Sequence, residues 1–422
     1  MKQQKTNNWQ IKKLGEVCDL QNGYAFKSSD YIENSNTLIF RMSQIRPGGS
    51  LDLNHNSKYL PDNFVEKYTD YILKDGDVVI AMTDMASETK ILGLPTYFKS
   101  DGRNFLLNQR VGKLHKFNVD EINIKYLRYI LSSPNIIHYY KSFGKGALQI
   151  NLGKNDILSA EIPIPPIETQ HAIVSKIEEL FSELDKGIAE LKTAQLQLKT
   201  YRQSVLKSAF EGKLTNENVK DGELPDGWEV VKISDISRVV RGGSPRPAGD
   251  PKYYDGDIPF LKVADLTKDN GIYLTTYKYS IKEAGLHKTR QISPNTLLLS
   301  NSGATLGVPK ICMINATMND GVAAFLDLDE RSNHYLYYFW VSKTLELRGI
   351  NMGAGQPNLN TDLIKDYKVP YCSFEEQQRI VQEIESRLSV ADKMEQSIQE
   401  SLQKAEALRQ SILKKAFCGE LV

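Results

Sequence analysis

The sequence predicts an α/β (α+β) fold in which two similar mixed domains are separated by two long antiparallel coiled-coil helices, as an internal pseudo-twofold repeat. Residues 168–210 and 375–417 each carry apolar side chains in steps of three and four with sevenfold recurrence, as a coiled-coil helix does. Polar residues recur at the same offsets in both segments, as Gln170 and Gln377 do. Chance heptad similarity would not repeat polar positions, so the chain contains a duplication.

The two helices are expected to pack on each other. A single helix of about 43 residues spans roughly 60 Å and needs a partner to bury its apolar stripe. The first helix carries the chain from the first domain to the second, so a second helix that packs along it must run back, and the pair is antiparallel. The predicted seam consists of Ile177, Leu184, Leu191, Leu198, Val205, Ile384, Ala391, Ile398, Ala405 and Ile412.

The domain boundaries follow from the helices and from one polar stretch. The segment TNENVKDGELPD, broken by Gly222 and Pro225, is typical of a linker. The chain therefore divides into a first domain at 1–165, a central helical spacer at 166–213, a linker at 214–227, a second domain at 228–370 and a C-terminal helical spacer at 371–422.

Each domain has the local signals of mixed structure. In the first, Val78–Met82 follows a turn and reads as a buried strand, and Ile124–Leu131 reads as an amphipathic helix. The second domain repeats such anchors in the same order, and its Gly242 answers Gly23 of the first. Between these anchors the two copies differ in residue and in length. A repeated frame with divergent residues suits two different binding specificities.

Composition favours a soluble, intracellular, cytoplasmic protein. The chain has 422 residues, a net charge of +1, 41% hydrophobic and 25% charged residues, which is ordinary for a globular protein. Its N-terminus is polar, and no apolar run approaches the length of a membrane span. Its four cysteines are scattered without a paired spacing, so they indicate neither a zinc site nor a disulfide framework.

Catalytic and metal-binding patterns are missing from the sequence. No GxxxxGK[ST] loop is present to hold a triphosphate, and the six histidines form no metal-binding pair at a spacing of four. Pro165 and Pro166 are followed by Ile167 where an adenine methyltransferase motif needs an aromatic residue. We therefore expect no catalytic residue and no metal site in this chain.

Duplicated domains on a spacer suit a partner with two separated sites, and duplex DNA is the obvious case. Arg and Gln make bidentate contacts to guanine and adenine edges. The alternative for any single candidate is a solvated loop without a ligand. The candidate DNA-binding residues are Arg41, Gln44, Arg46 and Lys145 in the first domain and Arg241, Ser244, Arg246 and Lys262 in the second. Residues common to both copies are expected to be scaffold or phosphate contacts, and these are Gln149, Asn151, Gln356 and Asn358.

Several features together resemble a known family. They are the order domain, helix, domain, helix; the segment Gly353–Leu359; the helix opening Glu376–Ile380; and the helix ending Arg409–Phe417. In this order and duplication they resemble the specificity subunit of Type I restriction-modification enzymes over essentially the whole chain.

The resemblance implies a function and a set of partners. Each domain would be a target recognition domain for one half of a bipartite, asymmetric site in double-stranded DNA, and the helices would be the spacer. Two methyltransferase subunits would dock on this chain, and endonuclease/translocase subunits would complete the complex. S-adenosylmethionine, ATP and magnesium would bind to those partner subunits, and this chain would hold no cofactor.

Two other classes of function remain open at this point. A coiled-coil adaptor whose two domains bind proteins would also suit the low net charge, and it would not shift the mobility of DNA even with methyltransferase partners present. A nuclease or methyltransferase in its own right is disfavoured by the absent motifs.

Overall fold

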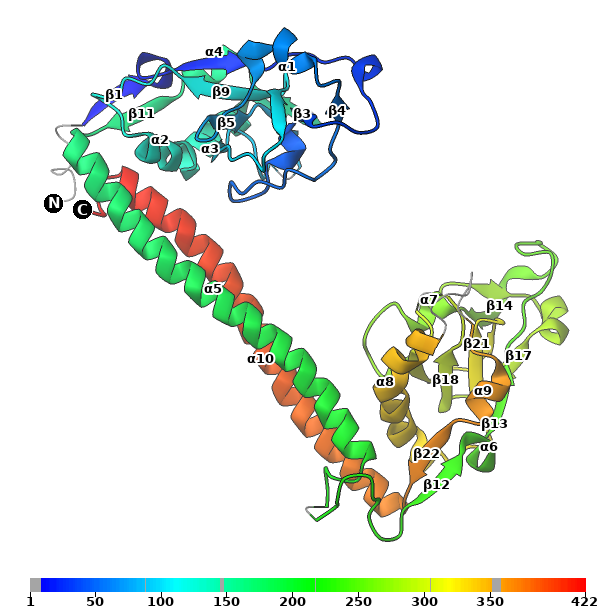
Figure 1. The fold of residues 1–422 in the computed structure, drawn as a ribbon. Helices are drawn as coiled ribbons and strands as arrows, with labels where there is room; N and C mark the ends of the chain where they lie inside the picture. Colours follow the sequence, from blue (N-terminus) through cyan, green and yellow to red (C-terminus); the bar gives the residue numbers. More distant parts are fainter. Residues whose placement is uncertain (1–8, 88, 145–147, 217, 304, 351–357) are drawn as a thin grey trace. The chain divides into compact units, whose positions relative to one another are not determined.

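The computed structural model describes residues 9–87, 89–144, 148–216, 218–303, 305–350 and 358–422. It divides into two compact units, one formed by residues up to Leu191 together with Glu400–Val422, and the other by Lys192–Gln399. Each unit contains one mixed α/β head and a part of each of two long helices (Figure 1). The predicted fold class is therefore confirmed. Among the described residues, no helix is both long and apolar enough to cross a membrane.

The two long helices are α5 (Ile167–Phe210) and α10 (Phe374–Phe417), each of 44 residues. Both begin one residue before the predicted start and end at the predicted residue. Gly212 and Gly419 follow the helix ends with φ of +76° and +72°, the left-handed conformation in which glycine commonly terminates a helix. The duplication therefore extends to the way in which the helices stop.

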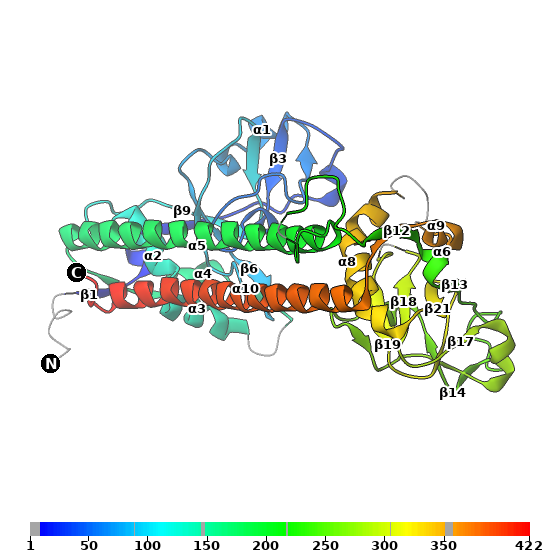
Figure 2. The ribbon, with the colours of Figure 1, turned by 90° about the horizontal axis from the view of Figure 1, so that it is seen from below.

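The helices run antiparallel within each unit, side by side in Figures 1 and 2. In the first unit, the first turns of α5 share a core with the last turns of α10, and this core contains Ile177 and Ile412. In the second unit, the last turns of α5 share a core with the first turns of α10, and this core contains Val205 and Ile384. Of the ten predicted seam residues, Leu184, Leu191 and Ile398 are half-buried, and the other seven are buried.

Equivalent ion pairs join the helices in the two units. In the first unit, the Arg409 guanidinium contacts the Asp185 carboxylate. In the second, the Arg202 guanidinium lies 2.6 Å from the Asp392 carboxylate and 2.8 Å from that of Glu395. Arg202 matches Arg409, and Asp392 matches Asp185, in the repeat. Partly exposed pairs contribute little energy each, but these two cross between helices and therefore favour one register of the antiparallel pair.

The first head contains a four-stranded and a three-stranded sheet. Strand order is β2-β9-β5-β7 in one and β4-β3-β8 in the other. Helices α2 (Ile124–Leu131) and α3 (Pro134–Lys141) cover the larger sheet on the side that meets α5 and α10. The strands are β2 (Asp19–Asn22), β3 (Thr37–Phe40), β4 (Tyr59–Leu60), β5 (Val78–Ala81), β7 (Pro95–Tyr97), β8 (Asn104–Leu107) and β9 (Val111–His115). Short elements between them are η1 (Leu14–Glu16), η2 (Ser28–Asp30), η3 (Met42–Gln44), α1 (Phe64–Lys67), η4 (Thr69–Tyr71), η5 (Ser142–Gly144) and α4 (Lys154–Leu158).

The second head repeats this topology with one additional strand in each sheet. Its sheets have the orders β13-β21-β18-β19-β15 and β16-β14-β20-β17, and α8 (Asn333–Ile350) takes the place of α2 and α3. The strands are β13 (Arg238–Arg241), β14 (Tyr254–Leu261), β15 (Tyr273–Leu274), β16 (Ser280–Ile281), β17 (Arg290–Ile292), β18 (Thr296–Ser300), β19 (Pro309–Cys312), β20 (Ala316–Met318) and β21 (Val322–Leu326). Its remaining short helices are α6 (Ile233–Ile236), α7 (Val263–Leu266), η6 (Glu283–Lys288), η7 (Glu330–Ser332) and α9 (Thr361–Lys365).

A two-stranded ladder closes each head where its long helix begins. Strand β1 (Gln10–Lys13) pairs with β11 (Glu161–Ile164), and β12 (Glu229–Lys232) pairs with β22 (Lys368–Tyr371), both antiparallel. The Tyr126 hydroxyl donates to the carbonyl of Pro163 at 2.8 Å, and Tyr335 donates in the same way to Pro370 at 2.6 Å. Each head thus holds the segment that leads into its helix by the same bond.

We expect the Asp185–Arg409 ion pair to stabilise the antiparallel register of the two helices. Arg409→Asp places two carboxylates together, and we expect the free energy of unfolding to fall by about 1 kcal/mol, the upper range for exposed pairs. The exchanged variant Asp185→Arg/Arg409→Asp restores the pair with its signs reversed, so we expect most of this loss to be recovered. Urea unfolding at low salt measures this cycle.

A pair within one helix serves as the control. Lys176 lies 2.8 Å from Glu179 along α5, and Lys176→Glu should cost only a few tenths of a kcal/mol, as pairs on one helix do. An exchanged variant that stays as unstable as Arg409→Asp would show that the interhelical pair does not favour this register.

Candidate nucleic-acid interface

One edge of the first head gathers the ends of several strands around the turn Asn108–Val111. We call it the Asn108 edge. The Gly23 amide donates to Val111 O at 3.2 Å, and the Asn108 amide donates to Phe40 O at 3.1 Å. The Met82 amide donates to the carbonyl of Arg110 at 3.0 Å. These bonds fix the carboxyl ends of β2, β3 and β5 against the start of β9.

The second head builds the same edge around the turn Asn319–Val322, which we call the Asn319 edge. The Gly242 amide donates to Val322 O at 3.0 Å, and the Asn319 amide donates to Leu261 O at 2.9 Å. The Asn301 amide donates to the carbonyl of Gly321 at 2.9 Å. The two edges therefore match bond for bond, and Asn319 corresponds to Asn108.

The repeated glycine of the sequence has a steric reason at these edges. A Cβ on Gly23 would lie 2.1 Å from the carbonyl oxygen of Asn108, and one on Gly242 would lie 2.2 Å from that of Asn319. Such distances are far below contact, so only glycine allows the loop after β2 or β13 to lie this close to the turn.

Three of the four candidates in the second head come together at the Asn319 edge, around Asp320. Arg241 donates from Nε to the backbone oxygen of Asp320 at 2.5 Å. The Ser244 hydroxyl donates to Asp320 Oδ1 at 2.6 Å, and Arg246 Nη2 lies 3.8 Å from Oδ2. Asp320 was not among the predicted residues. Extending the Gly23–Gly242 match to the turns at Asn108 and Asn319 would have found it.

A buried tyrosine anchors the loop that carries Arg246. The Tyr254 hydroxyl donates to the carbonyl of Pro245 at 2.8 Å and is almost fully buried. Burial raises the pKa of this tyrosine, so its hydroxyl remains a protonated donor. The fourth candidate, Lys262, precedes α7, and its ammonium lies 3.7 Å from the centre of the Tyr279 ring. This cation–π contact holds Lys262 beside the edge.

In the first head, Arg41 occupies the position of Lys262. Each follows the strand that contacts the turn, and each begins a short helix. The Arg41 amide donates to Gln44 Oε1 at 2.8 Å, as the Lys262 amide donates to Asp265 Oδ2 at 2.8 Å. Arg41 and Lys262 are therefore structural equivalents that remain candidates for DNA contact.

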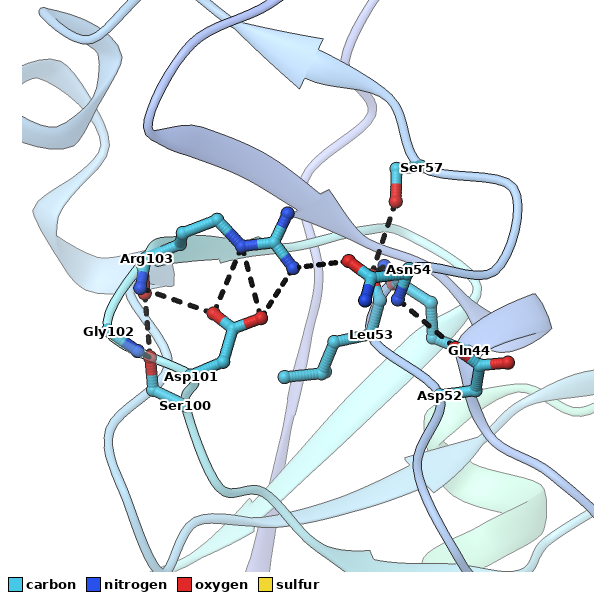
Figure 3. Close-up of polar contacts among 9 residues, drawn as sticks. All are labelled: Gln44, Asp52, Leu53, Asn54, Ser57, Ser100, Asp101, Gly102 and Arg103. Atoms are coloured by element: carbon cyan, nitrogen blue, oxygen red, sulfur yellow. Dashed lines mark hydrogen bonds and ion pairs between the residues drawn. The ribbon is translucent and has the colours of Figure 1, made fainter.

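Gln44 is removed from the candidate base readers. Its exposed fraction is 0%, and its amide donates to the carbonyl of Leu53 at 2.9 Å while its oxygen accepts the bond from Arg41. A side chain whose polar atoms are buried and paired cannot also bind a base. In the sequence, nothing near Arg41 or Arg46 indicated that Gln44 is buried. Figure 3 shows Gln44 directed toward the segment around Leu53, which it stabilises.

An exposed ion pair also stabilises the segment around Leu53. Arg103 donates from Nη2 to Asn54 Oδ1 at 2.7 Å and pairs with the Asp101 carboxylate (Figure 3). These bonds from Arg103 lower the pKa of Asp101, so the pair is charged at neutral pH. The third candidate of this head, Arg46, lies half-exposed in a turn in which its amide donates to Ser50 O at 2.8 Å. Among the described residues, no hydrogen bond links Arg46 to the Asn108 edge.

The residues shared between the copies lie beside these edges. Gln149 and Asn151 belong to β10 (Gln149–Asn151), which pairs with β6 (Thr83–Met85) directly after Met82. Asn151 Oδ1 accepts a bond from the Thr83 hydroxyl at 3.0 Å. In the second head, Asn358 forms the corresponding bridge with Ser302. Lys145 and Gln356 lie outside the described residues.

Both edges expose polar groups of the kinds that contact nucleic acids. Guanidinium, ammonium and amide groups lie on a frame of backbone hydrogen bonds, and such groups contact phosphates and base edges. Within the described ranges, no group of three or more His, Cys, Asp or Glu side chains is placed to hold a metal ion.

Comparison with known proteins identifies the family. The model of the Type I restriction modification DNA specificity domain matches residues 6–193 and again residues 225–404. The Type I restriction enzyme EcoBI specificity subunit of Escherichia coli is 26% identical over 438 residues, which cover 98% of this chain and 86% of that protein.

Solved structures share the fold. A chain from work on complex assembly and conformational transition of the type I R-M system aligns with a TM-score of 0.72 at 19% identity, over 98% of both chains. The HsdS subunit from Thermoanaerobacter tengcongensis aligns with a TM-score of 0.56 at 19% identity, over 98% of this chain and 97% of that one. With two matches to the family model along its length, this chain belongs to the Type I restriction-modification DNA specificity family.

Proposed function

We propose that this chain is the DNA sequence-specificity subunit of a Type I restriction-modification complex, without a catalytic role of its own. Each head acts as a target recognition domain for one half of a bipartite, asymmetric site in double-stranded DNA. The observation that carries this proposal is the pair of matching edges. Their backbone bonds are the same, whereas their exposed polar side chains differ, as two readers of different sequences require.

The charge of the chain is consistent with local rather than global attraction to DNA. Its net charge is only +1, so phosphate contacts depend on cations close to the edges, such as Arg41 and Lys262. The proposed partners supply further contacts. We therefore expect the isolated chain to bind DNA more weakly than the assembled complex does.

The two long helices are the proposed spacer between the half-sites. A helix of 44 residues is roughly 66 Å long at 1.5 Å per residue, and its antiparallel partner stiffens it. Each head is proposed to contact the major groove of its half-site. The centres of the two half-sites then lie about one turn of the DNA double helix apart. The helix pair then sets the number of base pairs that are not read.

Chemistry is assigned to the partners. Two methyltransferase subunits would bind this chain and carry S-adenosylmethionine, and endonuclease/translocase subunits would carry ATP and magnesium. An enzyme complex that modifies chromosomal DNA would work in the cytoplasm of a bacterium or archaeon. This chain contributes binding and orientation.

Mapping of modified adenines tests the proposal. The chain is expressed with its methyltransferase subunit in a host that lacks DNA methylation, and modified adenines are located by sequencing across the genome. We expect one bipartite, asymmetric motif with a fixed gap. An assembled complex that modifies no DNA would contradict the proposal and favour a protein-binding adaptor.

Lengthening one helix should lengthen the unread gap. Insertion of four residues after Gln195 adds about one turn, roughly 6 Å of helix, and we expect the gap in the methylated motif to grow while both half-sites stay the same. The same insertion after Gly222, in the linker outside both helices, is the matched control and should leave the gap unchanged. An unchanged gap in the Gln195 variant would refute the role of the helices as spacer.

Exchange of one head should change one half-site only. Replacing Trp228–Tyr367 with the corresponding segment of a relative leaves the Asn108 edge intact, so the half-site read by the first head should be kept. Methylation mapping of the chimaera measures both halves together. A change in both half-sites would show that the heads do not read DNA independently.

A further inference from the structure

The two matching turns carry different side chains on one backbone frame. In the first head the side chain of Asn108 accepts a bond from the Arg110 amide at 3.4 Å, and in the second Asn319 accepts one from Gly321 at 3.2 Å. Because these bonds match, Gln109 corresponds to Asp320, and Arg110 to Gly321. The backbone and the first and last residues of the turn are shared, whereas the two residues between them differ.

The strand that precedes the repeated glycine adds another such position. Asn22, the last residue of β2, pairs in register with Gly112, and Arg241, the last residue of β13, pairs with Ala323. Asn22 and Arg241 therefore occupy the same place, next to the turn. Both are exposed, as are Gln109 and Arg110. Polar residues that differ at equivalent exposed places are the ones expected to discriminate between two half-sites.

In the second head, Asp320 holds the arginines at this place. Its backbone oxygen accepts the bond from Arg241 Nε at 2.5 Å, which leaves the two terminal amino groups of Arg241 as a fork. Its carboxylate lies 3.8 Å from Arg246 Nη2 and also accepts the Ser244 hydroxyl. Such a fork matches the O6 and N7 acceptors of guanine. Asp320 thus restricts the arginines before DNA arrives, which lowers the entropy cost of binding.

In the first head the same place carries amides. Asn22 and Gln109 are exposed, and the backbone amide of Gln109 donates to the carbonyl of Tyr24 at 3.0 Å, which fixes the start of its side chain. Amide side chains match the N6 and N7 groups of adenine, and an arginine beside them matches guanine. The first head therefore offers a different set of donors and acceptors from the second.

Resting on the proposed function, we propose that these side chains read the bases. Asn22, Gln109 and Arg110 read the half-site of the first head, and Arg241 and Arg246 read that of the second. Asp320 is a positioning residue, which holds Arg241 by its backbone oxygen and Arg246 by its carboxylate. The first-head readers thus lie on the Asn108 turn and on β2, rather than in the segment from Arg41 to Arg46 to which the sequence pointed.

Two strands supply matched pairs of variants. Arg110 precedes β9 and Lys116 follows it, so Arg110→Ala and Lys116→Ala each remove one exposed cation, from opposite ends of one strand. In the same way, Arg238 and Arg241 are the two ends of β13, and Arg238 pairs with Asp327 at 2.7 Å away from the turn. Each complex is expressed with its methyltransferase subunit, and modified adenines are mapped.

We expect Arg110→Ala to relax one position of one half-site, with discrimination against the wrong base falling by about 5- to 150-fold, the worth of one bidentate contact. Arg241→Ala should do the same in the other half-site. Lys116→Ala and Arg238→Ala should keep the wild-type motif. If the wild-type complex gives a bipartite motif and both Arg variants keep it unchanged, this inference is wrong while the proposed function stands.

Lysine variants separate base reading from phosphate contact. Arg110→Lys and Arg241→Lys keep the charge but lose the planar fork, so they should relax the same positions without lowering total methylation. A residue that contacts only phosphate would instead weaken methylation of all sequences alike on substitution with alanine, and its lysine variant would restore wild-type behaviour. That pattern would overturn the assignment.

The role of Asp320 is tested by the positions of the methylated motif that its variant relaxes. Asp320→Ala removes the carboxylate beside Arg246 but keeps the backbone oxygen that holds Arg241. It should therefore relax the position that Arg246→Ala relaxes and keep the position that Arg241→Ala relaxes. A variant that is only less stable to heat, with its motif intact, would show that the Asp320 carboxylate supports the fold and does not position Arg246.

Discussion

The structure depends on the completion of each head by the ends of two different helices. Phe417, at the end of α10, packs against Tyr126 of the first head with ring centres 5.4 Å apart. Phe210, at the end of α5, packs against Tyr335 of the second head at 5.2 Å. Each head also buries the first turns of the helix that follows it. The core of each head therefore includes the start of one long helix and the end of the other.

This constraint gives a physical meaning to the duplication. Tyr126 and Tyr335 each pack against a helix end and hold the carbonyl of a proline before the next helix. Change at either position would disturb a strand ladder and a helix end together. The edges at Asn108 and Asn319 have their own shared bonds and lie on the sheets. Residues that hold the chain together and residues available for recognition are therefore largely separate, which allows recognition residues to change without loss of the fold.

Much of this architecture could be predicted from the sequence. Heptad spacing located both helices to within one residue at their starts, because an apolar stripe with a period of 3.5 has no other stable structure at that length. The match of Gly23 to Gly242 in the sequence marked two equivalent positions, and the structure shows a close backbone approach at both. In the second head, Arg241, Ser244 and Arg246 do come together, since Arg241 ends β13 and the other two lie on the short loop that begins at that glycine.

The parts that could not be predicted involve residues far apart in the chain. Gln44 lies between Arg41 and Arg46 in the sequence, and only the packing of the segment around Leu53 shows that it is buried. Asp320 lies 79 residues from Arg241, and a strand pairing is needed to bring them together.

The sequence by itself determined the duplication, the two helices and the order of the domains, because periodicity and repeats are local properties of the chain. The tertiary structure decided which polar side chains share an edge and which are buried. Those outcomes depend on strand register, which brings together residues that no spacing in the sequence connects.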